Sequence, residues 1–209
     1  MNIMRKILAS IRRKILSWYW RRKLNIGKNS CIIRPLRIAG EKGICIGDHV
    51  VVNEGCWIEC QPLTTNRNPR LVINDGCVLG HFNEIYSTSD IQLEKYVLTA
   101  DRVYISDNFH SYLDPEIPIL KQPIQQNRKV RIGEGSWLGV NVCVMGASIG
   151  KHCVIGANSV VIHDIPDYCV AVGAPARIVK RYDFSTKQWC KTDQEGNIIS
   201  SNVFASDGA

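Results

Sequence analysis

One histidine of the five in this chain lies where it could do chemistry. His110 sits near the start of a long irregular segment, residues 107–129, which contains three prolines, and the other four histidines lie outside it. A histidine held at the edge of a rigid element can take a proton from an alcohol or an amine as that group attacks a carbonyl carbon. We therefore predict that His110 is a general base, with an ordinary histidine of a surface loop as the alternative.

The element that would hold His110 is a repeat. An apolar residue recurs every six positions, often with a glycine one step later, and this period is too long for a strand and wrong for a helix. Six residues fit one short strand and a turn, so three units close a triangular coil with the anchor side chains inside. Stacked coils bury a face that no single unit could bury alone, which predicts a parallel β-solenoid over residues 26–172. The anchors are Ile46, Val52, Ile58, Ile73, Leu79, Ile85, Ile91, Leu93, Thr99, Ile105, Ile132, Leu138, Val144, Ile149, Ile155 and Val161.

A second position of the repeat, four residues after an anchor, carries small side chains, which suit a coil corner. The chain has nine cysteines, an odd number without a CxxC pair or a zinc-like spacing, so we predict buried free thiols rather than a disulfide framework. Free thiols predict a reducing compartment and hence a cytoplasmic protein. The small corner residues are Cys56, Cys77, Asn83, Ser136, Cys153 and Ser159.

The positive charge is concentrated at the N-terminus. The net charge is +7, but residues 1–25 hold eight lysines and arginines and no acid, which leaves 18 basic and 19 acidic residues elsewhere. This distribution disfavours nucleic acid as a partner, because the basic surface should lie on the folded domain. Apolar residues at helical spacing over residues 3–20 predict a basic amphipathic helix, too short in its apolar run to span a membrane. The helix would either lie on the inner face of the cytoplasmic membrane or cap the open end of the solenoid.

These patterns divide the chain into three parts. Residues 1–25 form the basic helix, residues 26–172 form the solenoid with the inserted loop at 107–129, and residues 173–209 follow it. We expect a turn and a short helix at GAPARIVKRY, then a polar tail from Asp183 whose end, GNIISSNVFASDGA at residues 196–209, is loosely held.

Residues 130–181 resemble the terminal signature of the hexapeptide-repeat acyltransferases, and DNFHSYLDPEIPILKQPI at 107–124 is similar to the loop that carries their catalytic histidine. The resemblance extends over residues 26–181 and is closest to sugar and polysaccharide O-acetyltransferases, such as those that modify galactosides, maltose, capsules and lipopolysaccharide. It implies a left-handed parallel β-helix, a homotrimer, acetyl-coenzyme A as co-substrate without a required metal, and a sugar or glycan acceptor.

The resemblance also implies roles for single residues. His110 matches the general base that deprotonates the acceptor hydroxyl for direct attack on the thioester, without an acyl-enzyme. Asn83 matches an asparagine that contacts the acceptor or the oxyanion. Positions beside the coenzyme are matched by Trp137, Gly139, Val140, Ala157, Arg177 and Lys180, of which the last two would lie near its phosphates. The sequence departs from the family at Ile162-His163, where a threonine and a lysine are usual.

Three other functions remain open from the sequence. The acceptor of an acetyltransferase could be serine or a xenobiotic hydroxyl instead of a sugar. A metal enzyme like the γ-class carbonic anhydrases could use His81 and His110 as ligands, although Pro115 stands where a further histidine would be needed. A non-catalytic scaffold is the third alternative.

Overall fold

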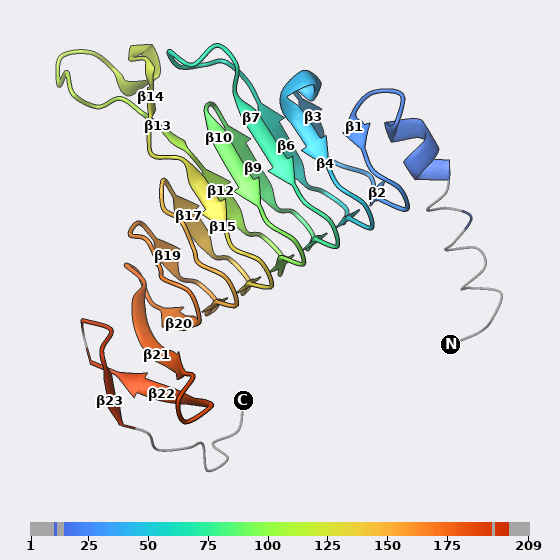
Figure 1. Cartoon of the computed structure of the whole chain (residues 1–209). Coiled ribbons are helices and arrows are strands. Elements are labelled where there is room, and N and C mark those ends of the chain that lie inside the picture. The colour runs from blue at the N-terminus through green and yellow to red at the C-terminus, as the bar shows by residue number, and fades with distance from the viewer. Residues whose placement is uncertain (1–10, 12–14, 194, 201–209) are drawn as a thin grey trace.

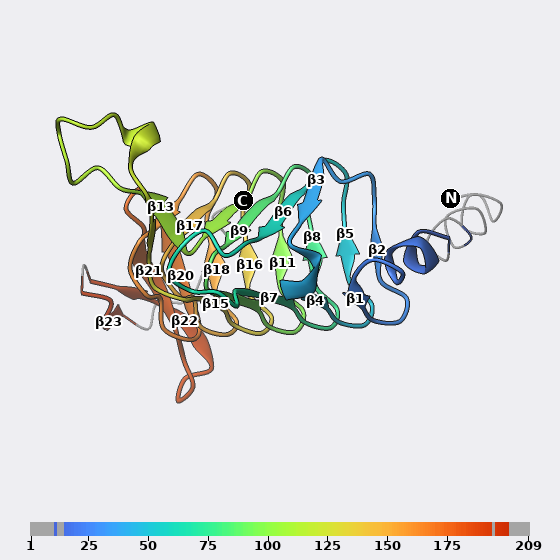
Figure 2. The same cartoon turned by 90° about the horizontal axis from the view of Figure 1, so that it is seen from above.

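The computed structural model describes Ile11, residues 15–193 and residues 195–200. Short strands joined by tight turns coil into a three-sided prism, and successive coils stack along one axis (Figure 1). Figure 2 shows the strands of each side lying next to one another along the prism. Because these sheets are parallel, the predicted solenoid is confirmed, and the fold is a left-handed parallel β-helix.

Each coil passes in turn through three parallel sheets, which we call faces one, two and three. Face one comprises β1 (Asn25–Ile26), β4 (Ile44–Ile46), β7 (Arg70–Ile73), β10 (Asp90–Leu93) and β15 (Val130–Ile132). Face two comprises β2 (Cys31–Ile32), β5 (Val51–Val52), β8 (Val78–Leu79), β11 (Leu98–Thr99), β16 (Trp137–Leu138), β18 (Val154–Ile155) and β20 (Cys169–Val172). Face three comprises β3 (Arg37–Ala39), β6 (Trp57–Cys60), β9 (Glu84–Ser87), β12 (Tyr104–Ser106), β17 (Cys143–Met145) and β19 (Val160–Val161), and a 3-10 turn, η1 (Glu41–Gly43), follows β3.

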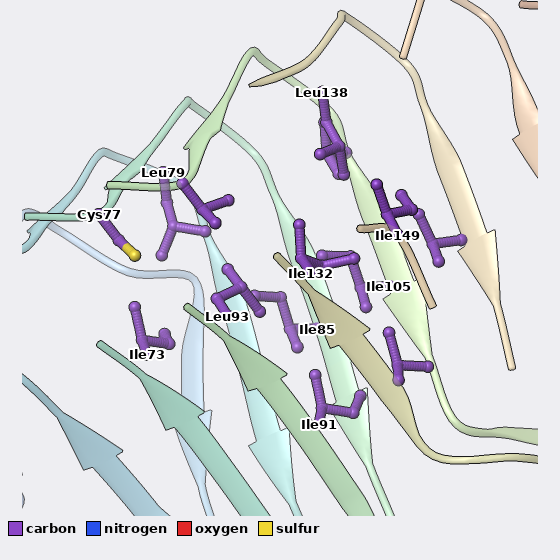
Figure 3. Close-up of a cluster of buried hydrophobic side chains, with 14 of the residues drawn as sticks. Ile73, Cys77, Leu79, Ile85, Ile91, Leu93, Ile105, Ile132, Leu138 and Ile149 are labelled. Carbon is purple, nitrogen blue, oxygen red and sulfur yellow. The ribbon is translucent and has the colours of Figure 1, made fainter. Parts of the chain in front are cut away.

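The anchor side chains point into the prism and stack on their counterparts one coil away (Figure 3). On face three, Ile85, Ile105 and Val144 occupy one row of the register and are completely buried. Burying apolar surface stabilises a fold by about 25 cal/mol per Å². A continuous apolar core along the prism axis therefore holds the coils together, as the six-residue period predicts.

The corner positions hold small side chains, and the thiols among them find backbone partners. The thiols of Cys56, Cys77 and Cys153 are buried and donate to the carbonyl oxygens of Gly80, Glu94 and Pro166, at Sγ–O distances of 3.2, 2.9 and 3.0 Å. All nine cysteines lie in the described part of the chain, and none forms a disulfide. The prediction of buried free thiols at the corners is confirmed.

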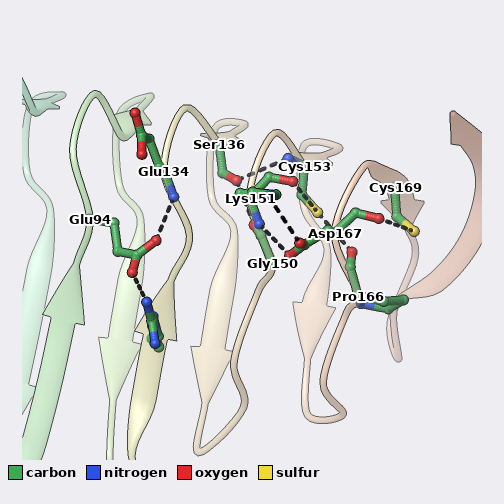
Figure 4. Close-up of polar contacts among 10 residues, drawn as sticks. Glu94, Glu134, Ser136, Gly150, Lys151, Cys153, Pro166, Asp167 and Cys169 are labelled. Atoms are coloured by element: carbon green, nitrogen blue, oxygen red, sulfur yellow. Dashed lines mark hydrogen bonds and ion pairs between the residues drawn. The ribbon is translucent and has the colours of Figure 1, made fainter. Parts of the chain in front are cut away.

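Carboxylates tie the turns of successive coils together. Asp101 Oδ1 accepts the backbone N–H of His81 at 2.7 Å, and Asp167 Oδ1 accepts that of Lys151 at 2.9 Å (Figure 4). These turns expose N–H groups that no strand partner satisfies, so a carboxylate one coil later supplies the acceptor. The bond from the His81 N–H is the main reason why the pKa of Asp101 lies below its ordinary value.

The first described residues pack against the open end of the prism. Residues 15–20 are helical, and Trp20 Nε1 donates to the carbonyl oxygen of Ile32 at 3.1 Å. Leu24 is buried on the first coil, whereas Ile15 and Trp18 are exposed. Residues 1–10 and 12–14, which carry most of the predicted amphipathic helix, lie outside the described residues. Within the described residues, no helix is long and apolar enough to cross a membrane.

Our prediction of a short helix after the solenoid is wrong. Arg177–Asp183 form a strand, β21, which pairs antiparallel with β20 and is followed by β22 (Gln188–Thr192) and β23 (Ile198–Ser200). The last coil leaves a row of unpaired N–H and C=O groups at the edge of β20, and a strand satisfies them where a helix could not. Residues 201–209, the end of the predicted tail, lie outside the described residues.

The corner thiols should resist modification in the folded protein. Burial raises the pKa of Cys56, Cys77 and Cys153 to about 11, so very little thiolate exists at pH 8. We expect iodoacetamide to alkylate these residues at pH 8 only after unfolding in guanidinium, as read by peptide mass spectrometry. Half-buried Cys45 serves as the internal control and should react first. Rapid alkylation of Cys77 in the native protein would contradict the packing described above.

Candidate functional site

The chain leaves the prism at Asp107, a completely buried carboxylate directly after β12. Its Oδ1 accepts the backbone N–H of Thr88 at 2.7 Å, and its Oδ2 accepts the N–H groups of Ser89 and Asp90 at 2.8 and 2.9 Å. The hydroxyl of Ser87 also donates to Oδ2, at 3.2 Å. Charge-assisted bonds of this kind are the strong ones, so Asp107 fixes the exit point of the loop to the turn one coil earlier.

The loop at 107–129 is an arm with an ordered base. β13 (Asn108–His110) pairs antiparallel with β14 (Ile124–Gln126), and a 3-10 turn, η2 (Ile119–Lys121), lies beyond them. The arm projects from the prism beyond β12 (Figures 1 and 2). Gln126 Nε2 donates to the carbonyl oxygen of Asp107 at 2.7 Å, which closes the base. The predicted irregular loop is therefore a ribbon at its base, and His110 ends one of its strands.

His110 is exposed and lines a groove between the arm and face three. The groove has a volume of about 390 Å³, within the range of about 300–1,000 Å³ for small-molecule sites. An imidazole at the rim of a groove is placed to accept a proton from a ligand inside it. The lining residues are Glu59, Gln61, Leu63, Glu84, Tyr86, Ser87, Thr88, Tyr104, Asn108, Phe109, His110 and Ile124.

Asn83 does not line the groove that contains His110. Its side chain is 1% exposed and points into a coil corner, where Nδ2 donates to the carbonyl oxygen of Ala100 at 2.9 Å. Its Oδ1 has no hydrogen-bond partner among the described residues. The expected contact between Asn83 and an acceptor is wrong for this structure, because the position belongs to the small-residue corner of the repeat and faces inward.

The expected coenzyme residues do lie together, on face two. Trp137 is 47% exposed on its outer side and is in register with Val154, Val170 and Lys180 across four adjacent strands. Three strand spacings of about 4.8 Å separate Trp137 from Lys180, so the row is about 14 Å long. It offers an aromatic ring at one end and a cation at the other.

Gly139, Val140 and Ala157 form the corner next to this row. A Cβ at Gly139 would lie 2.8 Å from the backbone nitrogen of Ala157, so only glycine lets the two coils approach this closely. Val140 is partly exposed, and its carbonyl oxygen accepts the N–H of Asn158 at 2.9 Å. The corner is therefore a flat stretch of backbone with small side chains.

Arg177 and Lys180 line a second groove, of about 700 Å³, on the antiparallel extension of face two. A third cation, Lys191, and the apolar side chains of Ile178 and Ile199 complete much of its wall. Three cations beside apolar surface suit a ligand that carries both phosphate and aliphatic groups.

His110 and the corner at Gly139 lie at opposite ends of face three. β17 leads away from the corner at Gly139 and pairs in parallel with β12, with Ser106 opposite Met145. The arm begins one residue after Ser106, so the strand length separates His110 from that corner. Within one copy of the chain, the base and the coenzyme row are held apart.

The histidines do not form a metal cluster in the described part of the chain, where no three His, Cys, Asp or Glu side chains come together as ligands. His81 lies at a turn, with Nδ1 3.0 Å from Asp101 Oδ1.

The sequence did not predict two features of the site: the buried carboxylate of Asp107 that holds the arm, and the two glutamates that line the groove. Asp107 reads as the first residue of a loop, and Glu59 and Glu84 read as ordinary exposed residues of the repeat. An acid at the point where the apolar period breaks is the signal that could have marked Asp107. The two glutamates gave no such signal, because their proximity to His110 depends on the direction of the arm.

The sequence is similar to several acetyltransferases. A galactoside O-acetyltransferase from Lactococcus lactis is 34% identical over 73% of this chain and 72% of its own length. A Mycobacterium tuberculosis protein named as an acetyltransferase is 42% identical over 63% of this chain, and an Escherichia coli protein named as a lipopolysaccharide biosynthesis O-acetyl transferase is 34% identical over 58%. The chain spans only 44% and 65% of these two relatives.

Solved structures share the fold. AntD, an N-acyltransferase from Bacillus cereus solved with dTDP and 3-hydroxybutyryl-CoA, superimposes with a TM-score of 0.63 at 17% identity, over 80% of this chain and 88% of that one. Residues 129–162 match the family model described as the hexapeptide repeat of succinyl-transferase. From the coiled architecture, this match and the Lactococcus relative, it follows that the chain belongs to the hexapeptide-repeat acyltransferase family.

Proposed function

We propose that this protein is an O-acetyltransferase that moves an acetyl group from acetyl-coenzyme A to a hydroxyl of a sugar or a cell-surface glycan. The observation that carries the proposal is the position of His110, exposed at the rim of a groove on a base that Asp107 and Gln126 hold rigid. Relatives named as a galactoside O-acetyltransferase and as a lipopolysaccharide biosynthesis O-acetyl transferase favour a sugar as the acceptor.

The reaction that we propose needs one base and no covalent enzyme intermediate. The imidazole of His110 accepts the proton of the acceptor hydroxyl while that oxygen attacks the thioester carbonyl carbon. The tetrahedral intermediate then collapses, the carbon–sulfur bond breaks, and the leaving thiolate takes the proton from the imidazolium. Backbone N–H groups facing the oxyanion would lower the barrier, and each such donor can contribute about 3–4 kcal/mol.

The coenzyme would lie on face two in this proposal. The row from Trp137 to Lys180 runs beside the glycine corner, so an extended aliphatic arm can lie against backbone there. Arg177 and Lys180 would offset the charge of the phosphates, Arg177 with a fork of donors that matches phosphate oxygens.

Such a site requires two copies of the chain, and we propose a homotrimer. His110 and the glycine corner lie at opposite ends of face three in one copy, so the arm of one copy would bring its His110 to the coenzyme of the next. The arm exposes Tyr112, Leu113 and Leu120, the last of them by 90%. Exposed apolar side chains gathered on one projecting element are typical of a surface that a partner covers.

We propose that the acceptor is made at a membrane, that the protein is cytoplasmic, and that its basic N-terminus brings it to the inner face of that membrane. The outward exposure of Ile15 and Trp18, with the Arg22 guanidinium 4.6 Å from the Trp18 ring centre, supports this. Aromatic rings next to cations suit the headgroup layer of an anionic membrane.

Replacing His110 with alanine should abolish most of the activity. Without the base, transfer to the best sugar in an acceptor screen should fall roughly a hundredfold or more, because general-base catalysis contributes about that much. Release of free thiol from acetyl-coenzyme A gives the rate, and circular dichroism checks the fold. His49→Asn, which suits the left-handed backbone at that exposed position, is the matched control. Full activity of His110→Ala would show that His110 is not the general base. If serine or a xenobiotic were the best acceptor in the screen, the proposal of a sugar acceptor would be wrong.

Replacing Arg177 with alanine should weaken coenzyme binding. An exposed ion pair to phosphate contributes modestly, so we expect the dissociation constant of coenzyme A to rise about threefold to tenfold. Calorimetry measures this constant, and the effect should shrink as salt is raised. Arg67→Ala, at another exposed arginine, should leave the constant unchanged. Equal affinities of Arg177→Ala and wild type would place the phosphates elsewhere.

Replacing Asp107 with asparagine should release the arm. The amide nitrogen would face the N–H donors of Ser89 and Asp90, or that of Thr88, and donors repel donors. We expect faster proteolysis within residues 111–123 and a clear loss of transfer rate, with coenzyme A affinity unchanged. Asp114→Asn, at the exposed tip, is the control. If Asp107→Asn left both protease resistance and rate intact, the carboxylate would not hold the arm.

A further inference from the structure

The outer surface of face three beside His110 alternates aromatic rings with carboxylates. Trp57, Glu84 and Tyr104 occupy one row of the register, and Glu59 lies opposite Tyr86 in the next row. Since alternate residues of a strand point to the same side, all five side chains lie on the outside of the prism. Each carboxylate is therefore flanked by rings.

The rings form a continuous strip. The ring centres of Trp57 and Tyr86 are 5.7 Å apart, as are those of Tyr86 and Tyr104, with tilted planes in both pairs. Tyr86 and Tyr104 line the groove together with His110. Aromatic faces of this kind pack against the C–H groups of a bound ligand at little cost in conformational entropy.

The carboxylates give the groove a negative character. Glu59 accepts Trp57 Nε1 and Gln61 Nε2, both at 2.7 Å, and Arg37 lies 3.7 Å away at the edge of the strip. Glu84 accepts the Tyr86 hydroxyl at 3.3 Å and forms no ion pair among the described residues. Burial and then the charge of Glu84 raise the pKa of Tyr86.

We propose that this groove is the acceptor subsite, that it takes an uncharged or amino-bearing sugar ring, and that Glu84 and Glu59 make it reject a ring that carries phosphate. The inference rests on the proposed function and adds the class of acceptor. Sugar hydroxyls donate to carboxylate oxygens while the ring's C–H face covers the tyrosines. A phosphate in the same place would meet like charges, which is a means of excluding a wrong ligand.

The contrast with the other groove supports this assignment. Arg177, Lys180 and Lys191 line the groove that we assign to the coenzyme phosphates, whereas His110 is the one basic side chain among the described residues that line the acceptor groove, and Arg37 lies beside Glu59. Opposite charge at the two sites would keep the coenzyme out of the acceptor groove and direct each substrate to its own place.

The test compares acceptors of similar shape and different charge. We would measure kcat/KM for methyl β-galactoside, glucosamine and galactose 1-phosphate in wild type, Glu84→Gln, Glu59→Gln and the exposed control Glu41→Gln. We expect wild type to favour the first two over the phosphate by tenfold or more, and Glu84→Gln to reduce that preference about tenfold, the effect of one unfavourable charge pair. Glu59→Gln should have a smaller effect, because Arg37 offsets its charge. KM for acetyl-coenzyme A and the control should not change.

The outcomes separate the two proposals. If wild type acetylates sugars without discriminating against the phosphate, and Glu84→Gln changes nothing, the subsite is wrong and the proposed function stands. If no sugar is acetylated, the proposed function fails, and saturation-transfer NMR with the same three sugars decides the subsite. Equal or absent binding of the three sugars would then overturn it. A change of oligomeric state in Glu84→Gln, read by analytical ultracentrifugation, would also overturn it by making the strip an interface between copies.

Discussion

The constraint on which this structure depends is the need to fill the inside of a narrow triangular coil. Each strand turns one or two apolar side chains inward, as Ile44 and Ile46 of β4 do, each corner admits a small side chain, and every coil must match the next in register. Inward positions are therefore fixed in type, as the buried row of Ile85, Ile105 and Val144 illustrates. Outward positions are free to vary, and all the chemistry we assign lies on them or on the arm.

Function arises where the repeat is interrupted. The arm leaves the prism at Asp107, and the buried carboxylate turns that break into a fixed joint by accepting three backbone N–H groups of the preceding turn. His110 lies three residues after Asp107, at the end of β13, and the pairing of β13 with β14 holds it in place. The regular coils contribute the rest, since strands in register align Trp137 with Lys180 on one face and Glu84 with Tyr104 on another.

The period of the sequence predicts the coils because inward packing imposes it residue by residue. It also predicts the buried thiols at Cys56, Cys77 and Cys153, and the break that carries His110. Asn83 shows the limit of that reasoning, because a residue matched to a functional asparagine falls at a corner and its side chain is inside the core.

Long-range contacts account for the other differences. The strand β21 forms because the edge of β20 needs a hydrogen-bonding partner. That requirement comes from β20 and cannot be recognised in the sequence of residues 177–183 alone. The grouping of Glu59 and Glu84 around His110 depends on where the arm points, which no spacing along the chain encodes. Local pattern thus specifies the prism, and contacts between distant segments specify the site.

The central claim is that the base of one copy serves the coenzyme bound on another. Mixing two impaired variants, His110→Ala and the double variant Arg177→Glu with Lys180→Glu, at an acetyl-coenzyme A concentration where neither alone shows substantial transfer, tests it most directly after the oligomers are dissociated and reassembled together. Mixed oligomers contain seams with an intact imidazole and an intact coenzyme row from different copies, so we predict that acetyl transfer returns. Transfer that stays absent in mixed oligomers of normal size and fold would contradict the account, since it would mean that each copy must supply both parts itself.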